Sequence, residues 1–393
     1  MVTKPRKGPF TVGLTTMSRY KSQDGEGMVQ GIPTATQPSK VELNEKQITD
    51  YQHHRKRMLK WCLNLGKDPD EAVGYSEDTI RVRAGHIDRF YRWVWNNASD
   101  GYTTQVTEEQ ADQYLKELAY RDDLSRSTAN KYKKALQMLF KWRSHDLGED
   151  HDWEPALTFS TNDTSSQPRD YLSRDERKQL REGVLELGDE IPSYKSVTPE
   201  ERRRIKKLLA VRLSKPLNEI GKDDWKEERS WKYPSMIYTT LDAGLRPIEV
   251  GRATTDWVDI DNAVLRIPKD ESSKNRENWT VALGEQTADV LDRWLTERQT
   301  YTRYDGRDEL WLTRRGNPYS SSSCNGLLRR VLEYTDIDRD VTWYSIRHSV
   351  GTYMSAEAGL GATQQQLRHK SSQTTLKYDQ APPEERRDAL DRM

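Results

Sequence analysis

Near its C-terminal end the chain reads LRHKSSQTTLKYD (residues 367–379), a polar segment with one histidine and one tyrosine nine residues apart. On one continuous helix nine residues turn through about 900°, so His369 and Tyr378 would lie on opposite faces. Ser371 and Ser372 are good N-cap residues, and a helix that starts there would separate the two side chains into different elements. The segment alone leaves two interpretations open: a surface helix with a solvated tyrosine, or two groups that meet at one site.

Three earlier segments of the chain also contain residues that could act at such a site. The first, LDAGLRPIEV (241–250), places an arginine at a tight junction between two helices. Gly244 is suited to end one helix and Pro247 to begin the next. Arg246 stands between them, where a side chain is aimed by the backbone. Glu249 follows three residues later and could brace its guanidinium.

A lysine and a second arginine follow. In ESSKNRENWTVAL (271–283) Lys274 occupies the connection between two predicted strands. In TWYSIRHSVGT (342–352) Arg347 and His348 come after Tyr344. Each segment taken singly has an ordinary structural interpretation, as an ion pair or a solvated turn.

Together these side chains are suited to bind and cleave a phosphodiester. Two guanidinium groups match the geometry of nonbridging phosphate oxygens and would stabilise the charge of a pentacoordinate transition state. A tyrosine hydroxyl can attack phosphorus and keep the bond energy in a covalent intermediate. A lysine can protonate the departing 5′-oxygen. No Gly-rich phosphate loop or zinc spacing occurs, and no metal or other cofactor is expected.

The order and spacing of these segments resemble the tyrosine recombinase (phage integrase) family. GLRPIEV is similar to the family's first-arginine box, and TWYSIRHSVGT to its second-arginine box. VDIDNAVLRIP followed by SKNRENWTVAL is similar to its β-hairpin with the active lysine, and LRHKSSQTTLKYD to its closing histidine-to-tyrosine box. The resemblance covers residues 169–380 and, more weakly, the region 48–147, which is similar to the family's core-binding domain.

The resemblance implies a role for each matching residue. Arg246 and Arg347 would clamp the phosphate, and Lys274 would be the general acid. His369 would be a further contact to the phosphate or the nucleophile. Tyr378 would be the nucleophile. Glu249 matches a supporting acidic position.

Two positions depart from the family's pattern. The second-arginine box usually reads His-x-x-Arg, but position 344 is tyrosine, and a phenol with a pKa of about 10 is a poor base at neutral pH. The group that deprotonates Tyr378 is therefore undetermined. His348 is next to Arg347 but about 100° away around a helix, so it is not given that role. Arg368 stands where the family usually has glycine, and either DNA contact or simple solvation is expected for it.

The first half of the chain predicts a helical bundle with a basic face. Apolar residues recur at helical spacing in four stretches between 48 and 140, and Thr107 to Gln110 fits a capping box. Residues 124–147 contain 6 Lys or Arg against 1 Asp or Glu. The cations that are candidates for DNA binding are Arg126, Lys131, Lys133, Lys134 and Lys141. A solvated face is the alternative interpretation.

Composition limits the class of protein. The chain of 393 residues has 63 basic and 63 acidic residues, so its net charge does not indicate a polyanionic partner. Its two cysteines, Cys62 and Cys324, are far apart and match no metal spacing, which suits free thiols in a reducing compartment. No apolar run reaches the length of a membrane span, and the first residues lack the core of a signal peptide. We expect a cytoplasmic protein.

The expected fold is α+β and mostly α-helical. An N-terminal helical core-binding (SAM-like) domain precedes a C-terminal helical catalytic domain with a small antiparallel β-sheet. The expected boundaries are a flexible basic arm (1–47), the core-binding domain (48–147), a linker (148–168), the catalytic domain (169–380) and a tail (381–393). A charged insertion at 190–230 resists assignment, and the tail is expected to form a helix opened by its two prolines.

The resemblance implies a site-specific recombinase or integrase whose two lobes close on double-stranded DNA. It would cleave through a 3′-phosphotyrosine, need no cofactor, assemble on DNA as a dimer to tetramer, and integrate or excise a mobile element. Two alternatives stay open: cleavage and religation like a type IB topoisomerase, and a DNA-binding protein whose active site has decayed.

Overall fold

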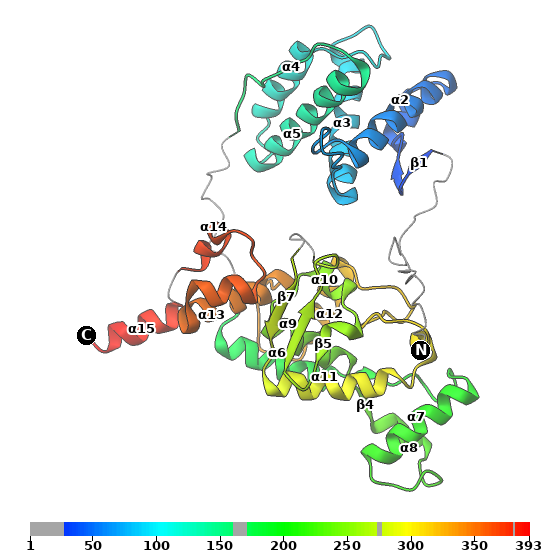
Figure 1. Cartoon of the computed structure of the whole chain (residues 1–393), viewed down its shortest axis with the longest axis vertical. Coiled ribbons are helices and arrows are strands. Elements are labelled where there is room, and N and C mark those ends of the chain that lie inside the picture. The colour runs from blue at the N-terminus through cyan, green and yellow to red at the C-terminus, as the bar shows by residue number, and fades with distance from the viewer. Residues whose placement is uncertain (1–26, 160–170, 273–276, 380–381) are drawn as a thin grey trace, which may run out of the picture. The chain divides into compact units, whose positions relative to one another are not determined.

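The computed structural model describes residues 27–159, 171–272, 277–379 and 382–393, which form two compact units. The first unit takes the described residues up to 159 and the second those from 171 onward. Helices dominate both units (Figure 1), and the sheets are small and antiparallel. The predicted fold class is confirmed. Within the described residues no helix is long and apolar enough to cross a membrane.

Four helices build the core of the first unit, where the apolar stripes predict them. They are α2 (Glu45–Asn64), α3 (Glu77–Asn97), α4 (Glu108–Ala119) and α5 (Arg126–Trp142). Each follows an Asn, Ser or Thr whose side chain accepts a backbone N–H of the first turn. At α4 the predicted capping box is present: Thr107 Oγ1 accepts the N–H of Gln110 at 3.2 Å, and Gln110 Oε1 accepts that of Thr107 at 3.0 Å.

The expectation of a flexible arm through residue 47 is wrong for residues 27–47. They form a hairpin and a helix, and α2 begins within them: β1 (Met28–Val29), β2 (Ile32–Pro33) and α1 (Gln37–Glu42). Val29 and Ile32 are buried in the core of the first unit, and Ser39 donates a hydrogen bond to the buried carboxylate of Asp88 at 2.7 Å. Two-residue strands leave no periodicity to detect in a sequence. The rest of the expected arm lies outside the described residues.

The chain after α5 stays attached to the first unit as far as it is described. A π-helical turn, η1 (Arg143–Leu147), continues α5. The imidazole of His151 then bonds the carboxylates of Glu108 at 2.9 Å and Glu149 at 2.8 Å, and Phe159 is buried. The expected linker is therefore wrong for residues 148–159, because a linker's aromatic and charged groups would be solvated.

One buried helix organises the second unit. Nearly every side chain of α9 (Lys232–Ala243) is buried, and three helices pack around it: α6 (Arg174–Leu187), α11 (Glu285–Arg298) and α13 (Trp343–Gln366). Ser173 caps α6, because its Oγ accepts a hydrogen bond from the N–H of Glu176 at 3.1 Å. Gly244 ends α9 in the left-handed conformation with φ 56°, and Pro247 begins α10 (Pro247–Arg252). Both features of this junction were predicted and are confirmed.

The predicted antiparallel sheet is confirmed. Its strands, in spatial order, are β5 (Val258–Asp259), β6 (Val264–Ile267) and β7 (Trp279–Ala282). Val264 lies opposite Ala282 and Ile267 opposite Trp279, so the connection between β6 and β7 starts at residue 268. Residues 273–276 of that connection lie outside the described residues.

Two further helices lie between the sheet and the last segment. The first is α12 (Ser321–Leu332), which begins with a capping box. The second is α13, which continues to Gln366 through a break at Gly359, where φ is 79°.

The charged insertion is structured. It contains α7 (Pro199–Arg212), α8 (Lys222–Glu227) and the strand pair β3 (Asp189–Glu190) with β4 (Arg229–Ser230). Ile205, Leu209 and Trp225 are buried and join the core of the second unit. Charged residues on every side of these few apolar positions conceal the helical period in the sequence.

No continuous helix joins His369 to Tyr378, as Ser371 and Ser372 predict. After α13 come a short helix, α14 (Ser372–Thr375), and a 3₁₀ turn, η4 (Leu376–Tyr378). Ser371 stands at the N-cap of α14, but its side chain makes no capping bond. Beyond them the predicted tail helix is present as α15 (Pro383–Asp391).

Candidate active site

Arg246 is fixed at the start of α10 by the acidic residue three positions later. Its backbone N–H donates to Glu249 Oε2 at 2.8 Å, and its Nη1 donates to Glu249 Oε1 at 2.7 Å. The arginine side chain is largely buried, with 8% of the residue exposed. The expected bracing contact is present, so the guanidinium is held in one orientation by a buried carboxylate.

Arg368 completes this ion cluster, and both expectations for it are wrong. It is fully buried, with Nη2 donating to Glu249 Oε2 at 2.8 Å and Nη1 donating to the carbonyl of Ala243 at 2.8 Å. Its backbone is left-handed, with φ 56°, the conformation that favours glycine. Burial alone would raise the pKa of Glu249, but the charges of Arg368, Arg246 and Arg347 together hold it well below its usual range. Arg368 therefore neither contacts solvent nor presents a charge to DNA in this conformation.

Arg347 projects from α13 to the end of α9. Its Nη1 donates to the carbonyl of Gly244 at 2.6 Å, and its Nη2 donates to the carbonyl of Leu367 and to His369 Nε2, the latter at 3.1 Å. Only 3% of the residue is exposed. Burial and the charges of Arg368 and Arg246 lower the pKa of Arg347 to about 9, so it is still cationic at neutral pH. Carbonyls at two helix ends supply the partial negative charge that keeps it there.

His369 is a neutral imidazole in this cluster. Because Arg347 can only donate, His369 Nε2 accepts, and the ring proton is assigned to Nδ1, which lies 3.0 Å from Thr375 Oγ1. Burial, followed by the charge of Arg347, lowers the pKa of His369 to about 3. Its ring lies parallel to that of Tyr378, with centroids 6.0 Å apart and an interplanar angle of 9°.

Tyr378 is covered in this conformation, with 4% of the residue exposed. Its ring rests on the backbone of Gly351, where an added Cβ would come within 2.5 Å of Tyr378 Cε1. Glycine is therefore required at 351 for this packing. The hydroxyl lies 2.9 Å from His348 Nδ1, and the two ring centroids are 5.8 Å apart.

His348 is the residue that sequence reasoning set aside. Arg347 and His348 do point in different directions from α13, as helix rotation predicts. Tyr378 is nevertheless within reach of His348, because η4 brings it to the side of the helix on which His348 lies. Its position beside Arg347 was the signal available in the sequence, but only the tertiary path of the last segment decides it.

Tyr344 does not join the cluster. It lies in the first turn of α13 with 47% of the residue exposed, and no hydrogen bond links it to the described cluster residues. Lys274, the expected general acid, lies outside the described residues. Lys269 is exposed at the start of the same connection, and its backbone N–H donates to Asn278 Oδ1 at 2.9 Å.

The candidate cations of α5 differ from one another. Arg126, Lys131 and Lys134 are exposed and Lys133 is partly exposed. Lys141 instead donates to the backbone carbonyls of Gly66 at 3.3 Å and Lys67 at 3.1 Å. Among the residues that the structure describes, no group of three or more His, Cys, Asp or Glu side chains could hold a metal ion.

Comparisons with known proteins find similarity in both units of the chain. The sequence model for the Phage integrase family matches residues 215–385, and that for the phage integrase N-terminal SAM-like domain matches residues 67–148. The tyrosine recombinase XerD of Ralstonia nicotianae is 24% identical over 281 residues, which cover 69% of this chain and 89% of that protein.

Two solved structures share the fold. The XerH site-specific recombinase bound to palindromic difH substrate, a post-cleavage complex, superposes with a TM-score of 0.52 at 15% identity and covers 88% of each chain. The Tn1549 transposon integrase in complex with transposon right end DNA superposes with a TM-score of 0.52 at 16% identity, covering 84% of this chain and 98% of that one.

Proposed function

Because the chain belongs to the phage integrase family of tyrosine-type site-specific recombinases, we propose that it cleaves and rejoins DNA through a covalent bond to Tyr378. The observation that carries this proposal is the convergence of Arg246, Arg347, His369 and Tyr378 from three separate segments. A buried network of ion pairs and carbonyl contacts holds the arginines before any substrate arrives. Such preorganised donors are what stabilises charge that develops on a phosphate.

The proposed reaction uses only side chains of this chain and groups of the DNA. Tyr378 Oη attacks phosphorus and forms a 3′-phosphotyrosine while the bond from phosphorus to the 5′-oxygen breaks. Arg246 and Arg347 hold the nonbridging oxygens. Lys274 is the proposed donor of the proton that the leaving 5′-oxygen takes. In the second step a 5′-hydroxyl attacks the phosphotyrosine and restores the phosphodiester.

We assign to His348 the proton that Tyr378 loses. The imidazole is already within hydrogen-bond distance of the phenol, and with its own proton on Nε2 it can accept at Nδ1. His369 is a poorer acceptor because its Nε2 is occupied by Arg347 and its pKa is lowered to about 3. Tyr344 is exposed, and among the described residues no hydrogen bond joins it to the phenol.

Attack requires Tyr378 to leave the position seen here. Its ring is enclosed by Gly351 and His369, so η4 has to shift for the hydroxyl to reach a phosphate at the surface. Until that shift the contact with His348 keeps the nucleophile covered, and the proposed proton transfer needs His348 to stay within reach of the hydroxyl as η4 moves.

Both units are proposed to bind the duplex, the first through the exposed cations of α5. Integration or excision of a mobile element in the cytoplasm is the proposed setting. The solved integrase of a transposon and the recombinase bound to its substrate support this choice of reaction over religation alone. A topoisomerase-like enzyme would cut and reseal one site without exchanging strands between two.

We propose that the tail takes part in assembly into a dimer or tetramer. The first turn of α15 is anchored to its own unit, where Tyr353 donates to Glu384 and Arg174 pairs with Glu385 at 3.6 Å. Leu390, nearer its end, is 69% exposed, which leaves an apolar contact for a neighbouring protomer. Deleting residues 381–393 should leave single-site binding intact while it lowers synapsis and recombination. Normal recombination by the truncated protein would remove this role.

A nicked suicide substrate tests the proposed function. Loss of the short fragment after cleavage traps the covalent complex, which migrates as a DNA-bearing protein band under denaturing conditions. Wild type should form that band, and Tyr378→Phe should bind the same DNA without forming it. A band of normal intensity from Tyr378→Phe would move the nucleophile to another tyrosine, and no band from wild type would favour the decayed DNA-binding protein.

A further inference from the structure

The helix α13 ends in a turn whose geometry favours glycine, yet position 368 is arginine. The backbone N–H of Arg368 donates to the carbonyl of Gln365 at 3.0 Å, and that of His369 donates to the carbonyl of Gln364 at 2.9 Å. These two bonds form a Schellman motif, in which the residue after the C-cap is left-handed. Arg368 has a φ of 56°, so the chain accepts backbone strain that glycine would not cause. Strain of this kind persists where surrounding contacts maintain it, often at functional sites.

The contacts that maintain it come from three helices. Arg368 Nη2 donates to Glu249 Oε2 in α10 at 2.8 Å. Its Nη1 donates to the carbonyl of Ala243, at the end of α9, at 2.8 Å and to that of Gln366, at the end of α13, at 2.7 Å. Only 1% of Arg368 is exposed. One buried side chain therefore fixes α10 relative to the ends of α9 and α13.

Arg368 reaches Arg246 through the carboxylate of Glu249. Glu249 Oε1 accepts from Arg246 Nη1 at 2.7 Å, whereas Oε2 accepts from the backbone N–H of Arg246 and from Arg368 Nη2, both at 2.8 Å. A charged donor on Oε2 opposes rotation of the carboxylate and so keeps Oε1 facing the guanidinium of Arg246. Replacing Arg368 would remove that donor and loosen the orientation of Arg246.

The second clamp arginine depends much less on Arg368. Arg347 Nη1 donates to the carbonyl of Gly244 at 2.6 Å, and its Nη2 donates to the carbonyl of Leu367. Arg368 Nη2 also points to the carbonyl of Gly244, but at the longer distance of 3.3 Å. Arg347 therefore keeps its own anchors when the side chain at 368 is replaced, and the effect of such a change should fall on Arg246.

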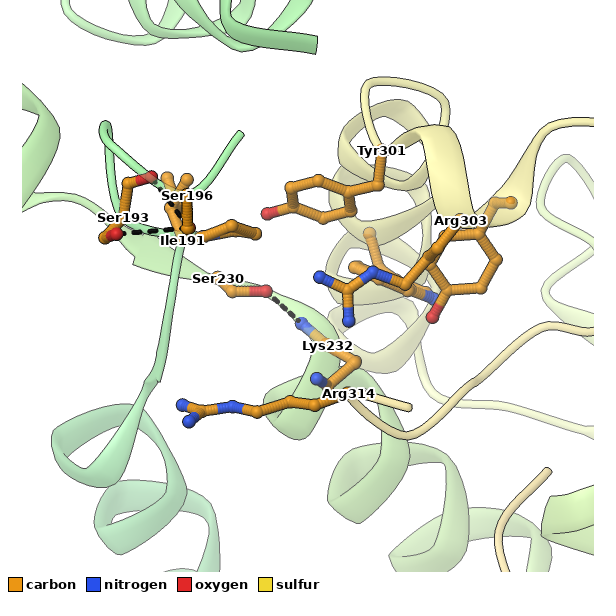
Figure 2. A pocket seen from close by; sticks show the side chains of 11 residues that line it. Ile191, Ser193, Ser196, Ser230, Lys232, Tyr301, Arg303 and Arg314 are labelled. Carbon is orange, nitrogen blue, oxygen red and sulfur yellow. Dashed lines mark hydrogen bonds between the residues drawn. The ribbon is translucent and has the colours of Figure 1, made fainter. Parts of the chain in front are cut away.

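The start of α9 has a comparable arrangement. Figure 2 shows Ser230 next to Lys232, the first residue of α9, whose backbone N–H donates to Ser230 Oγ at 3.2 Å. Ser230 in turn donates to the carboxylate of Glu297, which is fully buried. Arg212 Nη2 donates to Glu297 Oε2 at 2.8 Å. A buried arginine–glutamate contact thus lies at this end of α9 as well.

The two contacts form a matched pair. Arg212 with Glu297 and Arg368 with Glu249 use the same atoms at the same distance of 2.8 Å. A helix of 12 residues is about 18 Å long at 1.5 Å per residue, so the Arg212 contact is remote from Arg246. Loss of either contact disturbs a buried carboxylate, but only one of these carboxylates holds a clamp arginine.

We propose that Arg368 is a positioning residue for DNA cleavage, because through Glu249 it orients the guanidinium of Arg246 toward the phosphate. The inference rests on the proposed function, since it concerns the same reaction. Arg368 is buried and is not assigned a contact with the substrate. The planar fork of arginine can bond a carboxylate and two carbonyls at once, which explains why a strained arginine stands where glycine would fit freely.

Single-turnover cleavage of the nicked suicide substrate, together with a DNA-binding titration, tests this role in the full chain. Arg368→Gln and Arg368→Gly should each slow cleavage by about tenfold to 10²-fold, the scale of a misplaced catalytic group. DNA affinity should stay within about twofold, because a buried side chain neutralises no phosphate of the backbone. Arg212→Gln is the matched control and should cleave at the wild-type rate, even if it lowers the unfolding temperature.

A double variant separates positioning from a general structural effect. Arg246→Ala combined with Arg368→Gly should cleave within about twofold of Arg246→Ala alone, because the residue that Arg368 positions is then absent. Thermal unfolding of each variant shows that the comparison is made between folded proteins. Arg368→Gly is the variant best suited to fold, since glycine removes the strain at this position.

Four results would overturn the inference. Arg368→Gly could cleave at nearly the wild-type rate, or it could fail to fold, which would make Arg368 a folding residue. Arg212→Gln could lose as much rate as Arg368→Gln. The double variant could show the product of the two single losses, so that Arg368 would act independently of Arg246. Failure of the proposed function looks different, because wild type itself would then form no covalent complex and both claims would fall.

Discussion

The arginines of the candidate active site and the basic residues of α5 are all cations, but the two sets are held in opposite ways. Arg246 and Arg347 are buried, and a carboxylate, two helix-end carbonyls and an imidazole fix their positions. Lys131 and Lys134 project into solvent. A buried, fixed charge can discriminate a transition state from a ground state, whereas a mobile surface charge mostly attracts the phosphate backbone. The difference predicts where a lost cation will affect rate and where it will affect only affinity.

Removing a clamp arginine should have the largest effect. Arg347→Ala is expected to slow cleavage of a suicide substrate by about 10²–10³, the usual cost of one preorganised donor. DNA affinity should change by only a few-fold, because most phosphate contacts lie elsewhere. Single-turnover cleavage and a binding titration measure the two quantities.

A folding defect has to be separated from this loss, since Arg347 is buried. Arg347→Lys keeps the charge but not the planar fork, and we expect it to fold as wild type and still cleave slowly. If Arg347→Ala folds and cleaves at nearly the normal rate, the clamp assignment and the contrast with α5 are both wrong.

The proton acceptor is the next test. His348→Gln should slow cleavage by about 10²-fold, within the range for lost acid–base catalysis. Its rate should also rise with pH beyond the range in which the wild-type rate has levelled off, since the phenol then has to ionise without a base. Tyr344→Phe is the matched variant and should cleave within a few-fold of wild type. The reverse pattern, with His348→Gln normal and Tyr344→Phe slow, would return the role to position 344.

The buried cluster should also make stability depend on pH. His369 has a folded pKa of about 3 against about 6.5 when unfolded, so between these values the unfolded chain binds the extra proton. Stability therefore falls as pH drops below about 6.5, by at most about 2 kcal/mol at pH 5 from this residue. Denaturant unfolding at pH 7 and pH 5 should show a smaller difference for His369→Asn than for wild type. An equal difference would show that His369 is not neutral in the folded protein.

The smallest effect is expected on α5. Lys131→Ala and Lys134→Ala should each reduce the slope of log affinity against log salt concentration by about 1 and leave the cleavage rate of bound DNA unchanged. Lys141→Ala should not change the slope, because its ammonium bonds two backbone carbonyls. Identical slopes for all three variants and wild type would mean that this face is only solvated.

Local chemistry made much of the fold predictable. Capping residues at Thr107 and Ser173, the glycine that ends α9 and the proline that begins α10 each act over a few residues, and all four are present in the structure. The hairpin β6–β7 was visible in its β-branched runs. The short N-terminal strands and the insertion were not predictable, because their few apolar residues form no period.

Sequence patterns identified the arginines of the candidate site, but they did not identify the partners that come from distant segments. Glu249 could be paired with Arg246 because both belong to one turn of helix. Arg368 and His348 depend on where other segments pass: Arg368 reaches Glu249 across 119 residues of sequence, and His348 meets Tyr378 across 30. Such partners are set by tertiary packing, which no local pattern encodes.

The most direct test of the account is to locate the covalent bond itself. Wild-type protein would be trapped on a nicked suicide substrate, digested with nuclease and protease, and its nucleotide-bearing peptide sequenced by mass spectrometry. We predict a nucleotide linked through its 3′-phosphate to Tyr378. A nucleotide on Tyr344 or Tyr353, or one linked through a 5′-phosphate, would contradict the central claim.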